Sequence, residues 1–168
     1  IARPLPVSFS EAAARGTQFH ERLEEAFELE ADLDISDWQE QDRELGQAFL
    51  DSRFESLKPI YVEQALEFEL GGTVVVCKLD AVYQTEDGFE VIDWKSGSAP
   101  ESKAEVANKA VQLGLYRIGL SRWLGVGVER VKASFFFAGD SQEISPEVPS
   151  ENELMEKLRA FRKAPLRF

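Results

Sequence analysis

Apolar side chains recur along the chain with two different periods, and the alternation between these periods divides the sequence into helices and strands. The helical spacing predicts helices over 11–30, 44–57, 101–124 and 150–161. The two-residue spacing predicts strands over 60–70, 73–83, 89–95 and 128–138, with Gly71-Gly72 as a hairpin turn between the first two. Helices that alternate with strands in this way predict an α/β fold with a mixed central sheet, formed by about residues 60–138 and flanked by helices.

The second predicted hairpin, residues 73–97, places charged side chains in apolar strands. A two-residue turn at Asp87-Gly88 would set Asp80 opposite Lys95, and Asp93 two residues before Lys95 on the same strand. Residues that face each other across two strands share a face of the sheet, and so do residues two apart on one strand. The hairpin therefore predicts that Asp80, Asp93 and Lys95 converge on one face, whereas a three-residue loop would separate them.

Composition restricts the class of protein. With 168 residues and 43% hydrophobic residues, the chain has the size and apolar content of one globular domain. No apolar run reaches the roughly 18 residues of a membrane span, and no signal peptide is recognisable, so we expect a cytoplasmic protein without membrane partners. Cys77 is the only cysteine, which excludes an iron–sulfur cluster and a cysteine-based zinc site.

The charge distribution bears on nucleic-acid binding. A net charge of −12 is unusual for a protein that binds phosphates. Residues 103–132 nevertheless carry six Lys or Arg against two Glu, so one face can be locally basic. Because the chain begins with Ile1 rather than Met, we expect it to be a piece of a longer protein whose other part adds affinity for a charged polymer.

Two carboxylates followed by a lysine suit metal-dependent hydrolysis of phosphodiesters. Mg²⁺ binds a few hard oxygen ligands and retains waters, one of which can become the nucleophile. A lysine on the same face can orient that water or stabilise the negative charge of the transition state. The alternative is a buried Asp–Lys ion pair without catalytic purpose. For His20, beside the apolar stripe of the first helix, the alternative is a hydrogen-bonded histidine at the edge of the core.

Four short segments, taken in order, resemble the RecB-type exonuclease branch of the PD-(D/E)XK nuclease superfamily. They are GTQFH (16–20), KLDAVY (78–83), VIDWKSG (91–97), and the Gln112 and Tyr116 of QLGLY (112–116). The resemblance implies a restriction-endonuclease-like core and a Mg²⁺- or Mn²⁺-dependent deoxyribonuclease. It further implies that His20, Asp80, Asp93 and the Trp94 carbonyl bind metal, that Lys95 is catalytic, and that Gln112 and Tyr116 shape the site and contact DNA.

The same resemblance implies a biological setting. Residues 1–168 are similar to single nuclease domains that lie C-terminal to UvrD/Rep-like helicases, which implies an exonuclease acting with a fused or partner helicase in DNA repair and recombination. The alternative is an inactive nuclease-fold module that binds DNA or regulates the helicase. Relatives often carry a Glu at the position of Glu63, without a defined role. They commonly carry Gly where this chain has Cys77. The Cys77 side chain is therefore either tolerated on the side of the strand away from Asp80, or it crowds the sheet.

Overall fold

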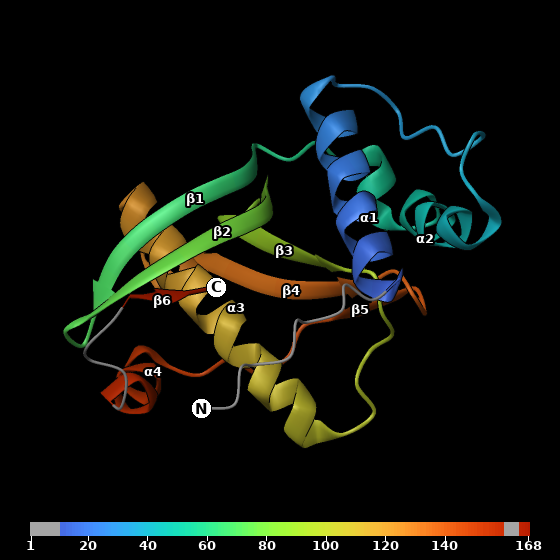
Figure 1. The fold of residues 1–168 in the computed structure, drawn as a ribbon. Helices are drawn as coiled ribbons and strands as arrows, with labels where there is room; N and C mark the ends of the chain where they lie inside the picture. The colour runs from blue at the N-terminus through green and yellow to red at the C-terminus, as the bar shows by residue number, and fades with distance from the viewer. Residues whose placement is uncertain (1–10, 160–164) are drawn as a thin grey trace.

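The computed structural model describes residues 11–159 and 165–168, which form an α/β fold (Figure 1). The helices are α1 (Glu11–Glu28), α2 (Glu40–Leu50), α3 (Lys103–Leu124) and α4 (Glu151–Leu158), with short 3-10 turns η1 (Arg53–Ser56) and η2 (Val128–Arg130). The strands are β1 (Tyr61–Leu70), β2 (Thr73–Gln84), β3 (Phe89–Lys95), β4 (Val131–Phe137), β5 (Gln142–Ile144) and β6 (Leu166–Arg167). Within these described ranges, no helix has the length and apolar character to cross a membrane.

The strands form one mixed sheet in the order β1-β2-β3-β4-β5, with β6 beside one end of β2. Along this order, neighbouring strands are antiparallel except β3 and β4, which are parallel and are connected by α3 (Figure 1). The short strand β6 runs parallel to β2. A parallel pair needs a long crossover, and a helix provides it. The predicted mixed central sheet flanked by helices is confirmed.

Gly71 and Gly72 form the turn of the first hairpin as the sequence predicts. Both have positive φ angles, +58° and +79°, and they connect the paired residues Leu70 and Thr73. A two-residue turn of this handedness favours glycine at both positions, because glycine has no Cβ to clash.

The predicted turn of the second hairpin, with Asp87 and Gly88 at its centre, is wrong by one residue. Thr85 donates its backbone N–H to the carbonyl of Gly88 at 2.8 Å, so the two central residues are Glu86 and Asp87. Gly88 has no positive φ; a Cβ there would lie 2.0 Å from the Arg130 carbonyl oxygen. The glycine therefore permits close approach of the η2 backbone rather than a primed turn.

The corrected turn shifts the strand register by two residues. Val82 pairs with Val91 rather than with Asp93, and one further step beyond the last pair sets Asp80 opposite Asp93 rather than Lys95. A shift of two preserves the face of every side chain, because side chains alternate with a period of two. The predicted opposite residues were wrong, but Asp80 still lies close enough to Asp93 for its charge to raise the pKa of Asp93. Strict alternation does not explain this, because Leu79 and Val82 both pack on the α3 side and the alternation of β2 breaks at about Asp80.

Each face of the sheet packs against a different group of helices. Ile92, Trp94 and Phe136 pack against α1, α2 and η1, whereas Val91 and Phe135 pack against α3. A third cluster joins α4 to α3 and to the far end of β2. The site residues of β3 thus lie between two separately packed layers.

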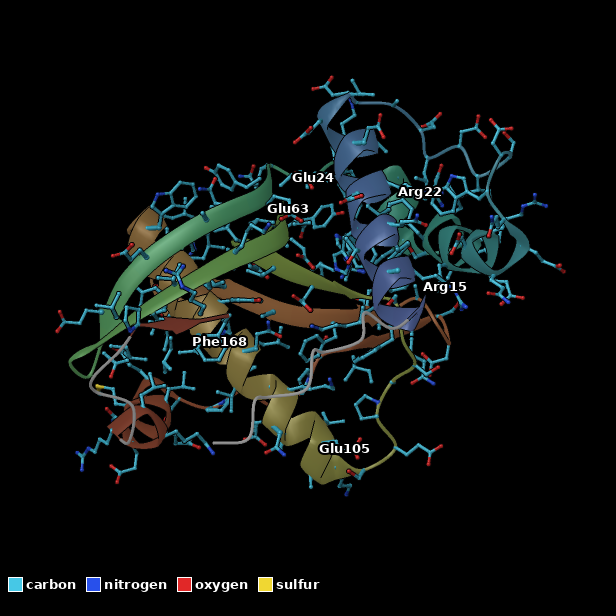
Figure 2. All side chains as sticks on the ribbon, viewed as in Figure 1. Arg15, Arg22, Glu24, Glu63, Glu105 and Phe168 are labelled. Carbon is cyan, nitrogen blue, oxygen red and sulfur yellow. The ribbon has the colours of Figure 1, made fainter. Side chains whose placement is uncertain are left out.

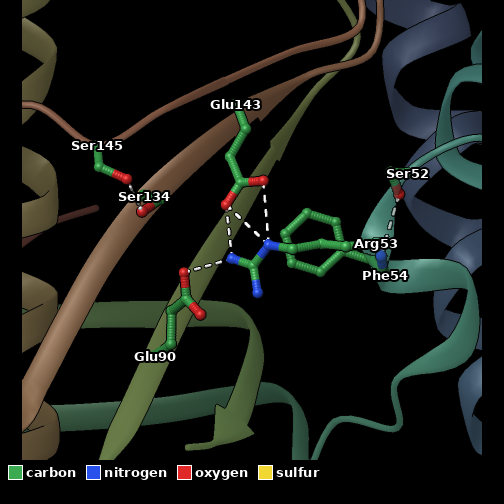
Figure 3. Close-up of polar contacts among 7 residues, drawn as sticks. All are labelled: Ser52, Arg53, Phe54, Glu90, Ser134, Glu143 and Ser145. Carbon is green, nitrogen blue, oxygen red and sulfur yellow. Dashed lines mark hydrogen bonds and ion pairs between the residues drawn. The ribbon is translucent and has the colours of Figure 1, made fainter.

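An ion pair anchors η1 against the sheet (Figure 3). Arg53 Nη2 lies 2.6 Å from Glu90 Oε1 on β3 and 2.5 Å from Glu143 Oε1 on β5. The guanidinium also lies over the ring of the neighbouring Phe54, 4.4 Å from its centroid. These contacts hold Phe54, which is fully buried, against the ring of Trp94 at 5.0 Å between centroids.

Two predicted element boundaries differ from the structure. The predicted helix over 44–57 begins earlier, at Glu40, and ends at Leu50, after which Ser52 caps the separate turn η1. The predicted strand over 128–138 begins at Val131, because residues 128–130 form η2. In both cases a local side-chain or backbone hydrogen bond ends one element where the apolar pattern continues.

Candidate active site

Asp80 lies where β2 stops pairing with β3. The last pair of that ladder is Ala81 with Ile92, and the next backbone N–H, that of Trp94, donates to Asp80 Oδ2 at 2.9 Å. The carboxylate thus takes the place of a backbone acceptor and is held at the fork between the two strands. A hydrogen bond from a backbone N–H to a carboxylate is stronger than one between neutral groups.

Asp93 is on the face of β3 that packs against α3, and only 4% of it is exposed. Its Oδ2 lies 3.0 Å from Nζ of Lys95. Burial raises the pKa of Asp93 to about 6, and the nearby Asp80 charge adds to this, while Lys95 and His20 oppose it. Asp80, Asp93 and Lys95, predicted as a group from the sequence, therefore lie close together. The pKa of one of the two carboxylates, that of Asp93, lies near neutral pH.

His20 projects from α1 toward the same carboxylates. Its Nε2 lies 3.3 Å from Asp80 Oδ2, and its Nδ1 lies 2.8 Å from the Gly16 carbonyl oxygen one turn earlier. Burial alone lowers the pKa of His20, but Asp80 and the carbonyls of Gly16 and Trp94 outweigh burial and raise it to about 9. The Trp94 carbonyl therefore also lies close to the histidine.

Gly16 allows this helix to approach the strand that carries Lys95. A Cβ at Gly16 would lie 2.8 Å from Oγ of Ser96. The glycine inside α1 therefore provides close approach of a neighbouring side chain, which places His20 next to the end of β3.

Gln112 and Tyr116 reach the site from α3. Gln112 Nε2 donates to the hydroxyl oxygen of Tyr116 at 2.6 Å, and Tyr116 is buried in the cluster between α3 and the sheet. Burial raises the pKa of Tyr116 strongly, and the charges of Asp93 and Asp80 raise it further. The phenol thus stays protonated close to both carboxylates, and since its oxygen accepts from Gln112, its own proton remains available for donation.

Trp94 is held with its ring turned away from the carboxylates. The ring makes edge contacts with Phe49, Phe54 and Phe136, with centroid separations of 5.6, 5.0 and 5.8 Å. Alternation then places its neighbours Asp93 and Lys95 on the opposite face. The aromatic cluster therefore sets the orientation of the end of β3.

Comparison with known proteins decides the family. Residues 2–165 match the model of the PD-(D/E)XK nuclease superfamily. The chain belongs to this superfamily. A crystal structure of a candidate exonuclease from Eubacterium rectale is similar in fold, with a TM-score of 0.54 and 13% identity. The match covers 88% of this chain and 64% of that protein, so the chain spans less than two thirds of its length. No curated protein matches the chain.

The family match and the similar fold confirm the predicted restriction-endonuclease-like core. Nucleases of this superfamily generally use divalent metal ions. Among residues 11–159 and 165–168, no three His, Cys, Asp or Glu side chains already surround one point as a metal centre would require. His20 and Asp80 face each other, and Lys95 lies against Asp93.

The donor chemistry of this superfamily site nevertheless suits a hard divalent ion. Asp93 Oδ2 is buried, and the partner that it has is the Lys95 ammonium at 3.0 Å. Two carboxylates, a backbone carbonyl and one imidazole are ligands that Mg²⁺ and Mn²⁺ accept. The residues His20, Asp80, Asp93 and Trp94 therefore fit such an ion.

Cys77, the departure from the family pattern, is accommodated in the core. Its side chain is buried with Leu79 and Leu113, on the opposite alternation from Asp80, and burial raises its pKa to about 11. The thiol therefore fills space as a small apolar group and does not enter the site.

Sequence reasoning left two neighbouring residues without a role. Glu63 and Lys78 line an open pocket of about 530 Å³ together with His20 and Asp80. Lys78 lies two residues before Asp80 on β2, and this spacing alone could have indicated a shared side of the strand.

Proposed function

We propose that this chain is a Mg²⁺- or Mn²⁺-dependent deoxyribonuclease of the RecB type, acting as an exonuclease in the cytoplasm. In this proposal residues 1–168 form a single nuclease domain, the C-terminal part of a larger helicase-nuclease. A fused or associated UvrD/Rep-like helicase supplies DNA during repair and recombination. The superfamily membership and the motif order described above support the proposal.

The observation that carries the proposal is the Asp93–Lys95 contact beside Asp80. Lys95 Nζ lies 3.0 Å from Asp93 Oδ2, and Asp80 is close enough to Asp93 to affect its titration. An ammonium beside two carboxylates at the end of adjacent strands places positive charge where a phosphate is to be attacked. A purely structural ion pair would not need the second carboxylate or the histidine.

His20, Asp80, Asp93 and the Trp94 carbonyl would hold the divalent ion in this proposal. When bound, the ion would lower the pKa of a water and add positive charge at the phosphate. Lys95 would donate a hydrogen bond to the attacking water or to a non-bridging phosphate oxygen, which stabilises the transition state. Hydrolysis forms a bond from phosphorus to the water oxygen and breaks one phosphodiester bond, whose leaving oxygen takes up a proton.

Gln112 and Tyr116 would act on the substrate rather than on the metal. The hydrogen bond from Gln112 orients the Tyr116 hydroxyl, and that hydroxyl remains a protonated donor near the site. A neutral donor of this kind can hold a phosphate oxygen in position without adding negative charge.

The decisive experiment measures cleavage of linear single- and double-stranded DNA with Mn²⁺ by the 168-residue chain. Asp93→Ala and Lys95→Ala should each lose at least about a hundredfold in kcat/KM, because each removes a group that acts in the transition state. Equal rates for wild type and both variants would contradict the catalytic assignment.

The inactive-module alternative makes a different prediction for metal binding. A working site binds Mn²⁺ at millimolar concentration, and Asp93→Ala weakens that binding. Calorimetry that detects no Mn²⁺ binding by the wild type, together with no cleavage, would favour the inactive module.

A further inference from the structure

The wall of the active-site pocket between α1 and β1 is acidic, which is unfavourable for a polyanionic substrate. Glu21, Glu24, Glu63 and Asp80 all line this pocket of about 530 Å³. Figure 2 shows Glu24 on α1 beside Glu63 on β1, at the side of the sheet that faces the helix. Burial raises the pKa of Glu24, and the neighbouring charges of Glu63 and Glu28 raise it further. These carboxylates repel one another, and they would repel a phosphate as well.

Lys78 is the one lysine or arginine among the described residues that line this pocket. Its side chain is 61% exposed, yet its Nζ lies 2.7 Å from Oε2 of Glu63, whose side chain is 15% exposed. Glu63 raises the pKa of Lys78, so the amine carries its charge at neutral pH. The cation is thus accessible to solvent on one side and held by a less mobile carboxylate on the other.

Glu63 occupies an unusual position in the sheet. The β1–β2 register passes from Val62↔Ala81 to Gln64↔Leu79, so Glu63 and Asp80 face each other in an interruption of the pairing. Glu63 has a φ of +50°, in the left-handed region that non-glycine residues rarely adopt. This conformation costs free energy and is common near functional sites. The interruption also removes Asp80 from the β1–β2 ladder.

Lys78 lies two positions before Asp80 on β2, a distance of about 6.6 Å along the strand. A cation at this distance from the proposed metal ligand can contact the same nucleic-acid strand as the metal without reaching the scissile phosphate. A lysine acts toward phosphate as an exposed point charge with three donors, which tolerates different strand orientations.

We propose that Lys78 binds a backbone phosphate adjacent to the scissile one, and that Glu63 is a positioning residue that holds the ammonium until the phosphate displaces it. This inference rests on the proposed nuclease function and adds to it a phosphate-binding position on β2. The Glu63–Lys78 contact is exchanged for a phosphate–Lys78 contact, so the acidic pocket wall accepts a polyanion at one defined place.

The first test measures the affinity of the 168-residue chain for fluorescein-labelled oligothymidine across a series of KCl concentrations. The measurement uses Ca²⁺ in a Lys95→Ala background to prevent cleavage. Lys78→Ala should weaken binding about five- to tenfold at low salt. It should also reduce the slope of log Kd against log salt by about 0.7, which corresponds to one phosphate on a single strand. Lys132→Ala is the matched control, since Lys132 is an exposed lysine on β4 outside this pocket.

A double-mutant cycle tests the part played by Glu63. Glu63→Gln removes the competitor for Lys78 and should tighten binding more than Glu24→Gln, which removes an equal charge from the same wall. The excess should disappear when Lys78→Ala is also present, because it depends on the freed ammonium. An equal effect of the two Gln variants in both backgrounds would overturn the proposed exchange.

Cleavage kinetics separate this inference from the proposed function. In the Lys95-containing chain, Lys78→Ala should raise KM with little change in kcat, and Lys78→Arg should restore KM. If the wild type cleaves DNA while Lys78→Ala and Lys132→Ala have the same KM and salt slope, the Lys78 inference is wrong and the nuclease assignment stands. If the wild type neither binds nor cleaves DNA with Mn²⁺, the proposed function fails, and this inference fails with it.

Discussion

The backbone N–H of Trp94 donates a hydrogen bond to the Asp80 carboxylate, with 2.9 Å between N and Oδ2. This contact joins β2 to β3 one step beyond their last backbone pair. It fixes the carboxylate where the two strands separate. It also orients Trp94, whose ring packs with Phe54 and whose carbonyl lies near His20. Architecture and proposed catalysis thus depend on the same hydrogen bond.

Asp80→Asn should separate these two roles. The Asn side-chain oxygen can still accept from the Trp94 N–H. Above pH 9, where His20 is neutral and its ion pair with Asp80 no longer contributes, the free energy of unfolding should therefore fall by less than about 1 kcal/mol, whereas cleavage should be lost with the charge. Asp80→Ala leaves that N–H without its acceptor and should cost about 1–3 kcal/mol. Urea unfolding and DNA cleavage by both variants test this. A variant Asp80→Asn that is unstable but fully active would instead indicate a structural ion pair.

His20 should make the metal-free protein less stable at alkaline pH. Its folded pKa of about 9 lies above the ordinary value of 6.5, so the native state binds the proton more tightly than the unfolded chain. The stabilisation is complete below pH 6.5 and is lost as pH rises through 9. It should amount to on the order of 2 kcal/mol, because the imidazole is held against Asp80 but remains partly screened by solvent.

The measurement is urea unfolding in EDTA at pH values on both sides of this window, with His20→Gln as the comparison. His20 is the only histidine in the chain, so no other imidazole contributes. The wild type should lose stability relative to His20→Gln as pH rises. Parallel stability curves for the two proteins would show that the contact with Asp80 does not shift the titration.

Asp93→Asn should stabilise the metal-free protein while removing activity. The raised pKa of Asp93, about 6 against an ordinary 3.8, means that the native state favours the neutral acid. Stability therefore decreases as pH rises from 3.8 through 6, and a neutral amide avoids this loss. At neutral pH the gain should be on the order of 2 kcal/mol in EDTA.

Added Mn²⁺ should reverse the order of stability of the wild type and Asp93→Asn. The wild type should gain stability with increasing Mn²⁺, and Asp93→Asn should gain little, because binding to the native state alone stabilises it. Thermal unfolding of both proteins with EDTA and with Mn²⁺ is sufficient. A wild type that is more stable than Asp93→Asn in EDTA would mean that the buried charge is compensated in the metal-free state.

Gly88→Ala should destabilise the hairpin that carries the catalytic strand. The added methyl group would lie 2.0 Å from the carbonyl oxygen of Arg130, so the turn or η2 must move, at a cost of about 1–3 kcal/mol. Gly97→Ala is the control, since nothing lies within 4 Å of the corresponding position and Gly97 has no positive φ. Comparable unfolding free energies for the two variants would contradict the close contact.

The chain by itself determined the order of elements and the side on which the key residues lie. Alternation along β3 placed Asp93 and Lys95 on one face, and an error of two residues in register did not change that face. The position of Asp80 beside them was not predictable in this way, because the alternation of β2 breaks between Leu79 and Val82. The Gly71-Gly72 turn was equally predictable, because its positive φ angles are a local property of glycine.

Only the tertiary structure decided the features that depend on contacts between distant segments. Gly88 resembled a turn glycine, but its place is set by Arg130, 42 positions along the chain. The pKa values of His20 and Asp93, and the pairing of Lys78 with Glu63, arise from burial and from charges that α1 and β1 bring to β2 and β3. Periodicity in the sequence predicts local geometry. The pKa values at the site depend instead on distances between segments, which are set only when the helices pack on the sheet.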